Sequence, residues 1–397
     1  MCFSDINPLS ETCPMDTPNA IDHMFFYFAK VEDPRRPHAT RLHSLEAILL
    51  ITILGTICGA HNWVEIEQWG QSRRAWLCEF LHLPHGIPSH DTFGRVFALL
   101  DPESLHQAFV AWMSALAQLG QEIMALDGKT IRRSLDRADG KGPIHVVSAW
   151  ASRNELVLAQ FKVDAKSNKI TALPELLALL NLEGNVVTID AMGCQVEIAR
   201  QIIDQGGEYV LSLKENQPNL YEDCVALFTW LKGPHTLDEK IVLGADEQVD
   251  GGHGRVETRQ VWCTSGLDGV VSCERWPGLR SLVMVEAPRH IGGQDEVEQR
   301  YSISSLPGAT DTDATRLNGV IRTHWEIENR VHWVLDVAMA EDSNRTRKGE
   351  SAQNLALIRK LALNLLRRET SVQTGLAAKQ KRAGWDHNYL LKILAQT

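Results

Sequence analysis

The chain has 397 residues, of which 44% are hydrophobic and 23% charged, and its formal net charge is −10 at pH 7. This length predicts a main domain with one or two additions, and the composition is that of soluble globular proteins. The acidic balance argues against a uniformly basic nucleic-acid-binding domain. Residues 343–382, however, contain ten Lys and Arg against two acids, which predicts either a local basic region or a solvated helix face.

The cysteines and the amino terminus exclude other classes of protein. None of the eight cysteines forms the CxxC spacing of a zinc or redox motif, which fits a cytoplasmic protein. No Lys or Arg precedes Lys30, so the charged start of a signal peptide is missing. The apolar run Leu45–Ala60 contains Glu46 and is shorter than the roughly 18 residues of a membrane span. We therefore expect residues 45–60 to form a buried helix, and we expect the protein not to associate with a membrane.

The first part of the chain reads as a tail followed by helices. Residues 1–20 are polar and predict a flexible tail, and residues 21–118 have a helical pattern. The run Gly86–Thr92 predicts a turn and an N-cap that open a helix through Leu100. Small helices around a tight turn fit a DNA-reading unit, and they fit a packing platform equally well.

From residue 119 to residue 236 the pattern changes to alternating strands and helices. The apolar runs 121–126 and 185–189 predict strands that end in Asp127 and Asp190, and residues 145–152 and 155–163 predict a hairpin. Helices are expected at 173–182 and 196–205, with another strand at 209–214. This order predicts a mixed α/β sheet flanked by helices.

The remaining part of the chain is predicted to contain an insertion, long helices and a tail. Residues 237–304 read as a β-rich insertion with strand candidates at 240–243, 255–262, 270–273 and 282–286. Within residues 305–370 we expect long helices at 313–336 and 352–368, and residues 371–397 form a predicted C-terminal tail.

Two acids stand where metal chemistry is plausible. Asp127 and Asp190 each come directly after a predicted buried strand, and an unpaired buried carboxylate is costly. Two acids at neighbouring strand ends repel each other unless cations neutralise them, and carboxylates without His or Cys partners favour Mg²⁺ or Mn²⁺. A lone Asp after a strand is otherwise a turn residue or helix cap, so this interpretation needs a third acid.

The predicted helix 313–336 supplies that acid. One helix face follows 4-3-4-3 spacing through Ile321, Trp325, Glu328, His332 and Leu335. This pattern places Glu328 on the face that packs on the sheet and Glu326 on another side. Trp325 and Trp333 sit at apolar helical positions and are expected in the core. Two metal ions between the acids would activate water or a 3′-hydroxyl and stabilise the leaving oxygen of a phosphodiester.

The residue strings around these acids resemble a known family. Asp127–Thr130, with Arg132, resembles the first-aspartate motif of DDE insertion-sequence transposases, and Thr188–Gln195 resembles the second. Tyr209–Pro218 is similar to the strand and loop that follow it, and His324–Val337 to the block that holds the glutamate. Together the strings resemble the H-repeat-associated group of these transposases, over roughly residues 20–370.

The resemblance implies a fold, an activity and partners. The fold is a ribonuclease H-like mixed sheet flanked by helices, with a β-rich insertion before the glutamate helix and a helical amino-terminal domain. The activity is DNA cleavage and strand transfer at the terminal inverted repeats of an insertion sequence, with Mg²⁺ or Mn²⁺ held by the catalytic acids Asp127, Asp190 and Glu328. The partner is double-stranded DNA of the element ends and the target. A homodimer on DNA and a cytoplasmic, nucleoid-associated location also follow.

Several residues near the acids are expected to contact DNA, because phosphate contacts position a substrate. The alternative interpretation of each is a solvated surface residue. The expected DNA contacts are Lys129, Arg132, Arg133, Lys214, Asn216, Gln217, His324, Arg345, Arg347 and Lys348. Related transposases carry a Tyr, a basic residue and a Lys around the glutamate, where this chain has Ile321, His324 and Leu335. That departure weakens the transfer of those accessory roles.

Two alternatives to an active transposase stay open at this point. One is a metal-dependent nuclease of the same fold that cuts DNA without joining ends. The other is an inactive, DNA-binding transposase relic, which the presence of all three acids disfavours.

Overall fold

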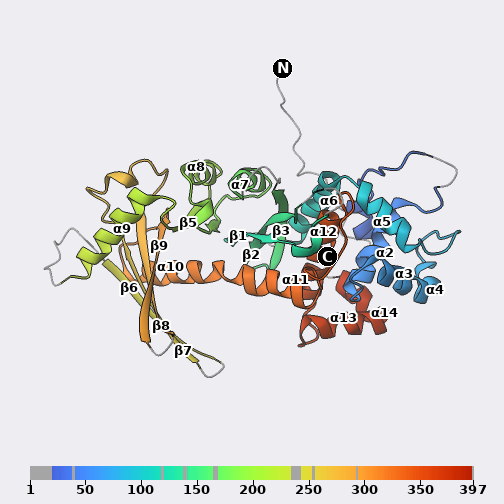
Figure 1. Ribbon diagram of the computed structural model, residues 1–397. Coiled ribbons are helices and arrows are strands. Elements are labelled where there is room, and N and C mark those ends of the chain that lie inside the picture. Colours follow the sequence, from blue (N-terminus) through green and yellow to red (C-terminus); the bar gives the residue numbers. More distant parts are fainter. Residues whose placement is uncertain are drawn as a thin grey trace, which may run out of the picture. The chain divides into compact units, whose positions relative to one another are not determined.

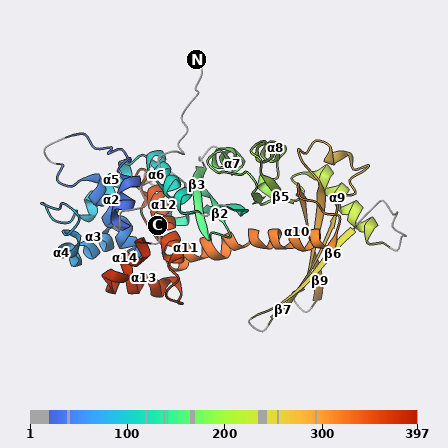
Figure 2. The ribbon, with the colours of Figure 1, turned by 180° about the vertical axis from the view of Figure 1, so that it is seen from behind.

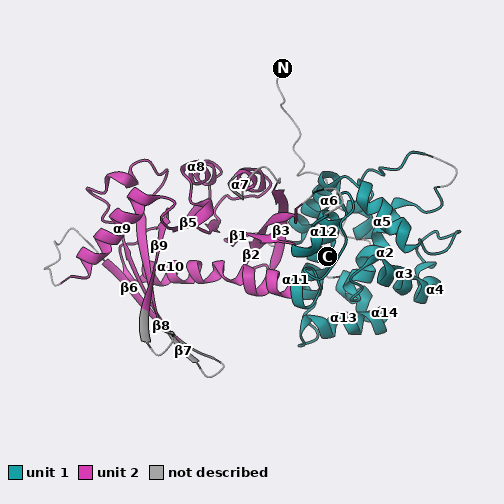
Figure 3. Ribbon diagram, viewed as in Figure 1, with its two compact units in different colours: residues 1–116, 132–141, 335–397 teal, residues 117–131, 142–334 magenta. Residues whose placement is uncertain are grey.

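The computed structural model describes residues 20–37, 41–117, 120–136, 140, 142–163, 169–233, 243–252, 255–291 and 294–395. Residues 1–19 of the expected tail lie outside this part of the chain. Two compact units are coloured separately in Figure 3. Unit 1 comprises residues 1–116, 132–141 and 335–397, and unit 2 comprises residues 117–131 and 142–334.

Unit 2 is built on a mixed sheet, to which its described residues contribute nine strands in the order β3-β2-β1-β4-β5-β9-β8-β7-β6 (Figure 1). Strands β1, β4 and β5 run parallel, and the other neighbours are antiparallel. The strands are β1 Ile123–Thr130, β2 His145–Ala151, β3 Leu156–Val163, β4 Val186–Ile189, β5 Glu208–Leu213, β6 Leu243–Gly252, β7 Arg255–Thr264, β8 Ser281–Ile291 and β9 Gln294–Ser304. This architecture confirms the expected fold class, and the β-rich segment extends the core sheet beyond β5.

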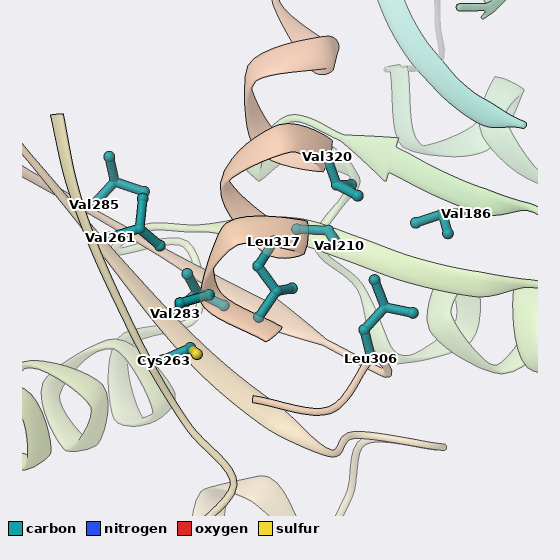
Figure 4. Close-up of a cluster of buried hydrophobic side chains, with 10 residues drawn as sticks. Val186, Val210, Val261, Cys263, Val283, Val285, Leu306, Leu317 and Val320 are labelled. Atoms are coloured by element: carbon teal, nitrogen blue, oxygen red, sulfur yellow. The ribbon is translucent and has the colours of Figure 1, made fainter. Parts of the chain in front are cut away.

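Helices cover the sheet of unit 2. They are α7 Lys169–Ala178, α8 Val196–Asp204, α9 Pro218–Leu231 and α10 Asp311–His324, with short 3₁₀ turns η1 Arg132–Ser134 (in unit 1), η2 Ala191–Gly193 and η3 Val271–Cys273. Figures 1 and 2 show α7 and α8 on the opposite side of the core strands from α10. Buried side chains of α10, such as Leu317 and Val320, pack on Val186 of β4 and Val210 of β5 (Figure 4). This contact identifies the sheet face that α10 covers.

Two of the elements predicted for unit 2 differ in kind from those of the structure. Residues 270–273, expected as a strand, contain the 3₁₀ turn η3, because the Cys273 amide bonds back to the Val270 carbonyl instead of to a neighbouring strand. The long helix expected at 313–336 is interrupted. After α10 comes a π-helix, η4 Ile327–His332, and then α11 Trp333–Val337, which crosses the boundary between the units.

Unit 1 is helical in its described residues. Its helices are α1 Ala20–Phe28, α2 Leu45–Ile57, α3 Trp63–Ser72, α4 Arg74–Leu77, α5 His90–Leu99, α6 Pro102–Leu116, α12 Ser351–Arg368, α13 Leu376–Trp385 and α14 His387–Leu394. Helix α2 is buried at every position except Glu46, as its apolar run predicted. Ser89 caps α5 as its sequence predicted. The segment expected as a C-terminal tail forms α13 and α14, which contact α2, α1 and α12. Among the described helices, none is long and apolar enough to span a membrane.

Candidate active site

A pocket of about 710 Å³ opens in unit 2 on the face of the sheet that α10 covers. Asp127, Asp190 and Glu328 all line it, although they lie on β1, after β4 and on η4. Glu326 is not among the lining residues and lies 3.7 Å from Arg330, measured between Oε2 and Nε. The structure therefore gathers the three predicted acids around one cavity and leaves the competing glutamate outside it.

The two aspartates are placed by the parallel ladder between β1 and β4. Leu126 pairs with Ile189 in this ladder, so Asp127 and Asp190 each lie one residue beyond the last pair. Side chains alternate between the faces of a strand. Asp190 therefore shares a face with Val186, which packs under α10. Asp127 was expected to end its strand, but β1 continues to Thr130 through its ladder with β2. The pairing of β1 with β4, by contrast, ends at Leu126, one residue before Asp127.

The turn after Asp190 is held by close packing and by hydrogen bonds. An added Cβ at Gly193 of η2 would lie 2.2 Å from Cγ2 of Ile189, so only glycine fits there without a shift. Asn216 donates to the Ala191 carbonyl at 2.7 Å, and Gln217 donates to the Cys194 carbonyl at 2.9 Å. Both amides were predicted as DNA-binding groups. In this structure the Asn216 and Gln217 side chains stabilise the loop after Asp190 by these hydrogen bonds. Asn216 also lines the pocket.

Cys194, at the end of this turn, is fully buried. Burial raises the pKa of the Cys194 thiol to about 12, so the group stays protonated at neutral pH.

The π-helix changes the helix face that carries Glu328. Within η4 and α11 the buried residues are Ile327, Val331 and Leu335, each four apart, where a regular α-helix repeats every 3.6 residues. The apolar stripe consequently passes through Ile327 and not through Trp325. Trp325 and Trp333, expected in the core, are 41% and 62% exposed. Glu328 follows the buried Ile327 and is exposed at the pocket wall.

Two histidines approach the acids from the same helical segment. Nδ1 of His332 lies 3.5 Å from Oδ2 of Asp127. His324, at the end of α10, has its Nδ1 3.0 Å from the Thr188 hydroxyl and lines the pocket. His324 was predicted as a DNA contact, whereas His332 was noted only as a member of the helix face. The spacing of four residues between Glu328 and His332 is the sequence signal that identifies His332.

The donor chemistry suits a hard divalent cation, because three carboxylates supply only oxygen ligands. As described, however, the acids do not form a ready set of ligands. Over the described ranges, no group of three or more His, Cys, Asp or Glu stands at metal-ligand spacing. The aspartates occupy neighbouring register positions at the end of the ladder between β1 and β4, and Glu328 reaches the same pocket from η4.

The β-rich insertion contributes positively charged side chains to the pocket lining. Arg259 of β7 and Arg300 of β9 line the pocket, together with Lys214 after β5. The Arg300 guanidinium lies 4.7 Å from the ring centroid of Trp325, and it forms two hydrogen bonds to Glu298 at 2.9 and 3.0 Å. Neither arginine was singled out from the sequence, because the insertion gave no charge cluster there.

The other predicted DNA contacts fall in both units. Lys129 lies two residues beyond Asp127 in β1, on the same face and half-buried. The basic residues that belong to unit 1 are Arg132, Arg133, Arg345, Arg347 and Lys348. Three of these residues make contacts within unit 1. Nε of Arg132 lies 3.3 Å from Oδ2 of Asp342. Nε of Arg347 donates to the Arg133 carbonyl at 3.1 Å.

The predicted basic region at 343–382 is only partly a surface. Arg359, Lys360 and Lys379 are 2%, 3% and 9% exposed, so they belong to the interior of unit 1. Arg359 donates to the His61 carbonyl at 3.2 Å, and Lys379 donates to the Leu366 carbonyl at 3.1 Å. Three of the ten cations are therefore buried and not available to DNA phosphates, and two of them donate to backbone carbonyls.

Comparisons with known proteins agree with the strings read from the sequence. The family model described as "Transposase DDE domain" matches residues 118–365, and the model described as "DDE_Tnp_1-associated" matches residues 25–113. The "Putative transposase YncI" of Escherichia coli O157:H7 is 37% identical over 95% of this chain and 95% of its own length. The "H repeat-associated putative transposase YhhI" of Escherichia coli K12 is 36% identical over 89% of this chain and 93% of its own. The chain thus belongs to the DDE transposase family, and its relatives include H repeat-associated members.

Proposed function

We propose that this chain is a transposase that cleaves and joins DNA strands at the terminal inverted repeats of an insertion sequence, with Mg²⁺ or Mn²⁺ as cofactor. The observation that supports this most directly is the convergence of Asp127, Asp190 and Glu328 on one pocket. The family membership of the chain makes this pocket the place to look for phosphoryl transfer.

In this proposal the three carboxylates hold the cations. Bound there, a pair of divalent ions would activate the attacking oxygen and stabilise the leaving oxygen of a phosphodiester. Without cations, Asp127 and Asp190 repel each other and would repel a DNA phosphate. Activity is therefore expected to depend strictly on the metal.

The positive side chains around the pocket would orient the DNA. Lys214, Arg259 and Arg300 line the cavity and present charge to phosphates without reading sequence. His324 lines the same cavity next to Thr188. The exposed cations of unit 1 are proposed to contact the backbone of the duplex outside the cleavage point. They include Arg133, Arg345 and Lys348.

The wider assignments are also proposals. Residues 21–118 would contribute DNA contacts as a helical amino-terminal domain, residues 119–236 and 305–370 would form the catalytic core, and residues 237–304 would be an insertion beside it. Two copies would act together on the two element ends, in the cytoplasm and associated with the nucleoid.

The test uses end-labelled duplexes that carry the inverted repeats flanking the element. Wild-type protein with Mg²⁺ is expected to cut at the repeat boundary and to join pre-cut ends to a target. Asp127→Asn, Asp190→Asn and Glu328→Gln should each abolish both reactions while DNA binding persists. The matched control is Glu326→Gln, which should stay active, because Glu326 lies outside the pocket.

Three outcomes would contradict the proposal. Cutting without joining would identify a nuclease of the same fold. Binding of the repeats without metal-dependent cutting would identify an inactive relic. Full activity in Glu328→Gln with loss in Glu326→Gln would show that the wrong glutamate was chosen.

A further inference from the structure

We propose that Glu155 and Arg330 form a positioning pair, which keeps η4 in its π register and thereby holds Glu328 at the pocket. This inference rests on the proposed function for its catalytic consequence. Its structural part, the state of one helical turn, can be tested without any reaction. Neither residue lines the pocket, so both are proposed to act through Glu328.

The first observation is the irregular hydrogen bonding of η4. The Trp333 amide donates to the Glu328 carbonyl, five residues earlier, where an α-helix would pair it with Asn329. This extra residue sets the four-residue spacing of the buried Ile327 and Val331. It also sets the spacing between Glu328 at the pocket and His332 at Asp127. A return to α-helical pairing would rotate Glu328 and His332 relative to each other.

The second observation is a contact that ties this turn to the sheet. The Arg330 guanidinium donates to the carboxylate of Glu155, at the turn between β2 and β3, and its Nε lies 3.7 Å from Glu326. Arg330 is therefore flanked by one acid on its own helix and one on the hairpin. The hairpin belongs to the same rigid sheet as Asp127, since β2 pairs with β1 along its length. The pair thus links the turn that carries Glu328 to the strand that carries Asp127.

The third observation is the backbone of Glu155. Its φ is +53°, in the left-handed region that favours glycine and asparagine. A non-glycine residue in this conformation whose side chain also makes a contact to another element is a candidate for a positioning role. Glycine would relieve the strain and remove the carboxylate, so Glu155→Gly separates the backbone conformation from the contact with Arg330.

The exposure of the pair limits what it does. Both side chains are 46% exposed, so the pair contributes little to global stability. It is expected to bias a local equilibrium between two helical registers. A single variant should therefore separate stability from activity, which a merely structural residue does not do.

The experiment compares Glu155→Gly, Arg330→Gln and the charge exchange Glu155→Arg/Arg330→Glu with wild type. Glu155→Gly should keep or raise the melting temperature, because it relieves the positive φ. It should also speed hydrogen exchange at the Trp333 amide and raise the Mg²⁺ concentration for half-maximal cleavage about tenfold, as loss of a supporting contact typically does. Arg330→Gln should share the last two effects, and the exchanged pair should restore both.

The control is Ala340→Gly, which relieves another non-glycine positive φ, of +52°, in unit 1. It should leave the Trp333 amide and the Mg²⁺ requirement unchanged. Unchanged Trp333 exchange in both Glu155→Gly and Arg330→Gln would overturn the positioning role, even if the wild type proved to be catalytically inactive. Failure of cleavage in wild type with altered exchange in the variants would instead reject the proposed function alone.

Discussion

The Gly193→Ala substitution tests how closely the turn after Asp190 is packed on its own strand. The new Cβ would lie 2.2 Å from Cγ2 of Ile189 and 2.9 Å from Cδ1 of Leu173. Packed apolar heavy atoms lie about 4 Å apart, so the turn or the Ile189 side chain has to move by more than about 1 Å. Asp190 lies between Ile189 and Gly193 in the chain, so we expect its carboxylate to shift with the turn.

We expect Gly193→Ala to lower the free energy of unfolding moderately and the cleavage rate strongly. Overpacking of this kind destabilises a core by about 1–3 kcal/mol, which should lower the urea midpoint without unfolding the chain. A misplacement of about 1 Å at a reacting centre costs on the order of 100-fold in rate. We therefore expect the cleavage rate of the inverted-repeat duplex to fall about 100-fold while circular dichroism shows a folded protein.

The matched control is Gly319→Ala on the exposed side of α10, where an added Cβ meets nothing within 4 Å. This variant should stabilise the helix by about 0.5–1 kcal/mol and cleave at the wild-type rate. The packing argument is wrong if Gly193→Ala cleaves normally. It is also wrong if the loss of activity only follows the fraction of unfolded protein.

Three further substitutions test the scaffold by urea unfolding. Glu286 accepts from Lys232 at 2.5 Å and from Gln299, and although burial raises its pKa, these hydrogen bonds lower the pKa below the ordinary 4.5. Its stabilising contribution is thus present above pH 4.5 and lost as the pH falls through the lowered value. Glu286→Gln should be less stable than wild type at pH 7, with a difference that vanishes in acid. Thr310→Ala removes the capping box with Asp313 and should cost about 1 kcal/mol. Leu54→Ala in the fully buried α2 should cost about 2–5 kcal/mol. An unchanged urea midpoint in any of the three would refute its argument.

The sequence was informative where local pattern and tertiary structure agree. The hairpin of β2 and β3 and the strands before Asp127 and Asp190 appear within a few residues of their predicted bounds, because each has a continuous apolar or alternating run. Strand β9 was missed, since its charged residues, such as Glu298 and Arg300, give no apolar alternation. Its pairing with β8 depends on the neighbouring strand and cannot be read from its own residues.

The helix that carries Glu328 shows a different limit. A constant period of 3.6 residues placed Trp325 and Glu328 on one inward face, yet the structure inserts a wide turn at Ile327 and exposes Trp325. Glu328 nevertheless lines the pocket, whereas Glu326 does not. The π register results from packing of Ile327 and Val331 and from the contact of Arg330 with Glu155, which lies far away in the chain. No local pattern contains that information.

The three acids are held with unequal rigidity, and this difference predicts two kinds of defective variant. The ladder between Leu126 and Ile189 fixes the separation of Asp127 and Asp190, whereas Glu328 is an exposed residue on an irregular helical turn. Loss of the Glu155 contact weakens only the approach of Glu328, so a high Mg²⁺ concentration should restore cleavage in Glu155→Gly by mass action. Gly193→Ala displaces Asp190 itself, so its rate should stay low at saturating Mg²⁺. Titrations of both variants with Mg²⁺ would check this, and rescue of Gly193→Ala to the wild-type rate would show that the two aspartates are as adjustable as the glutamate.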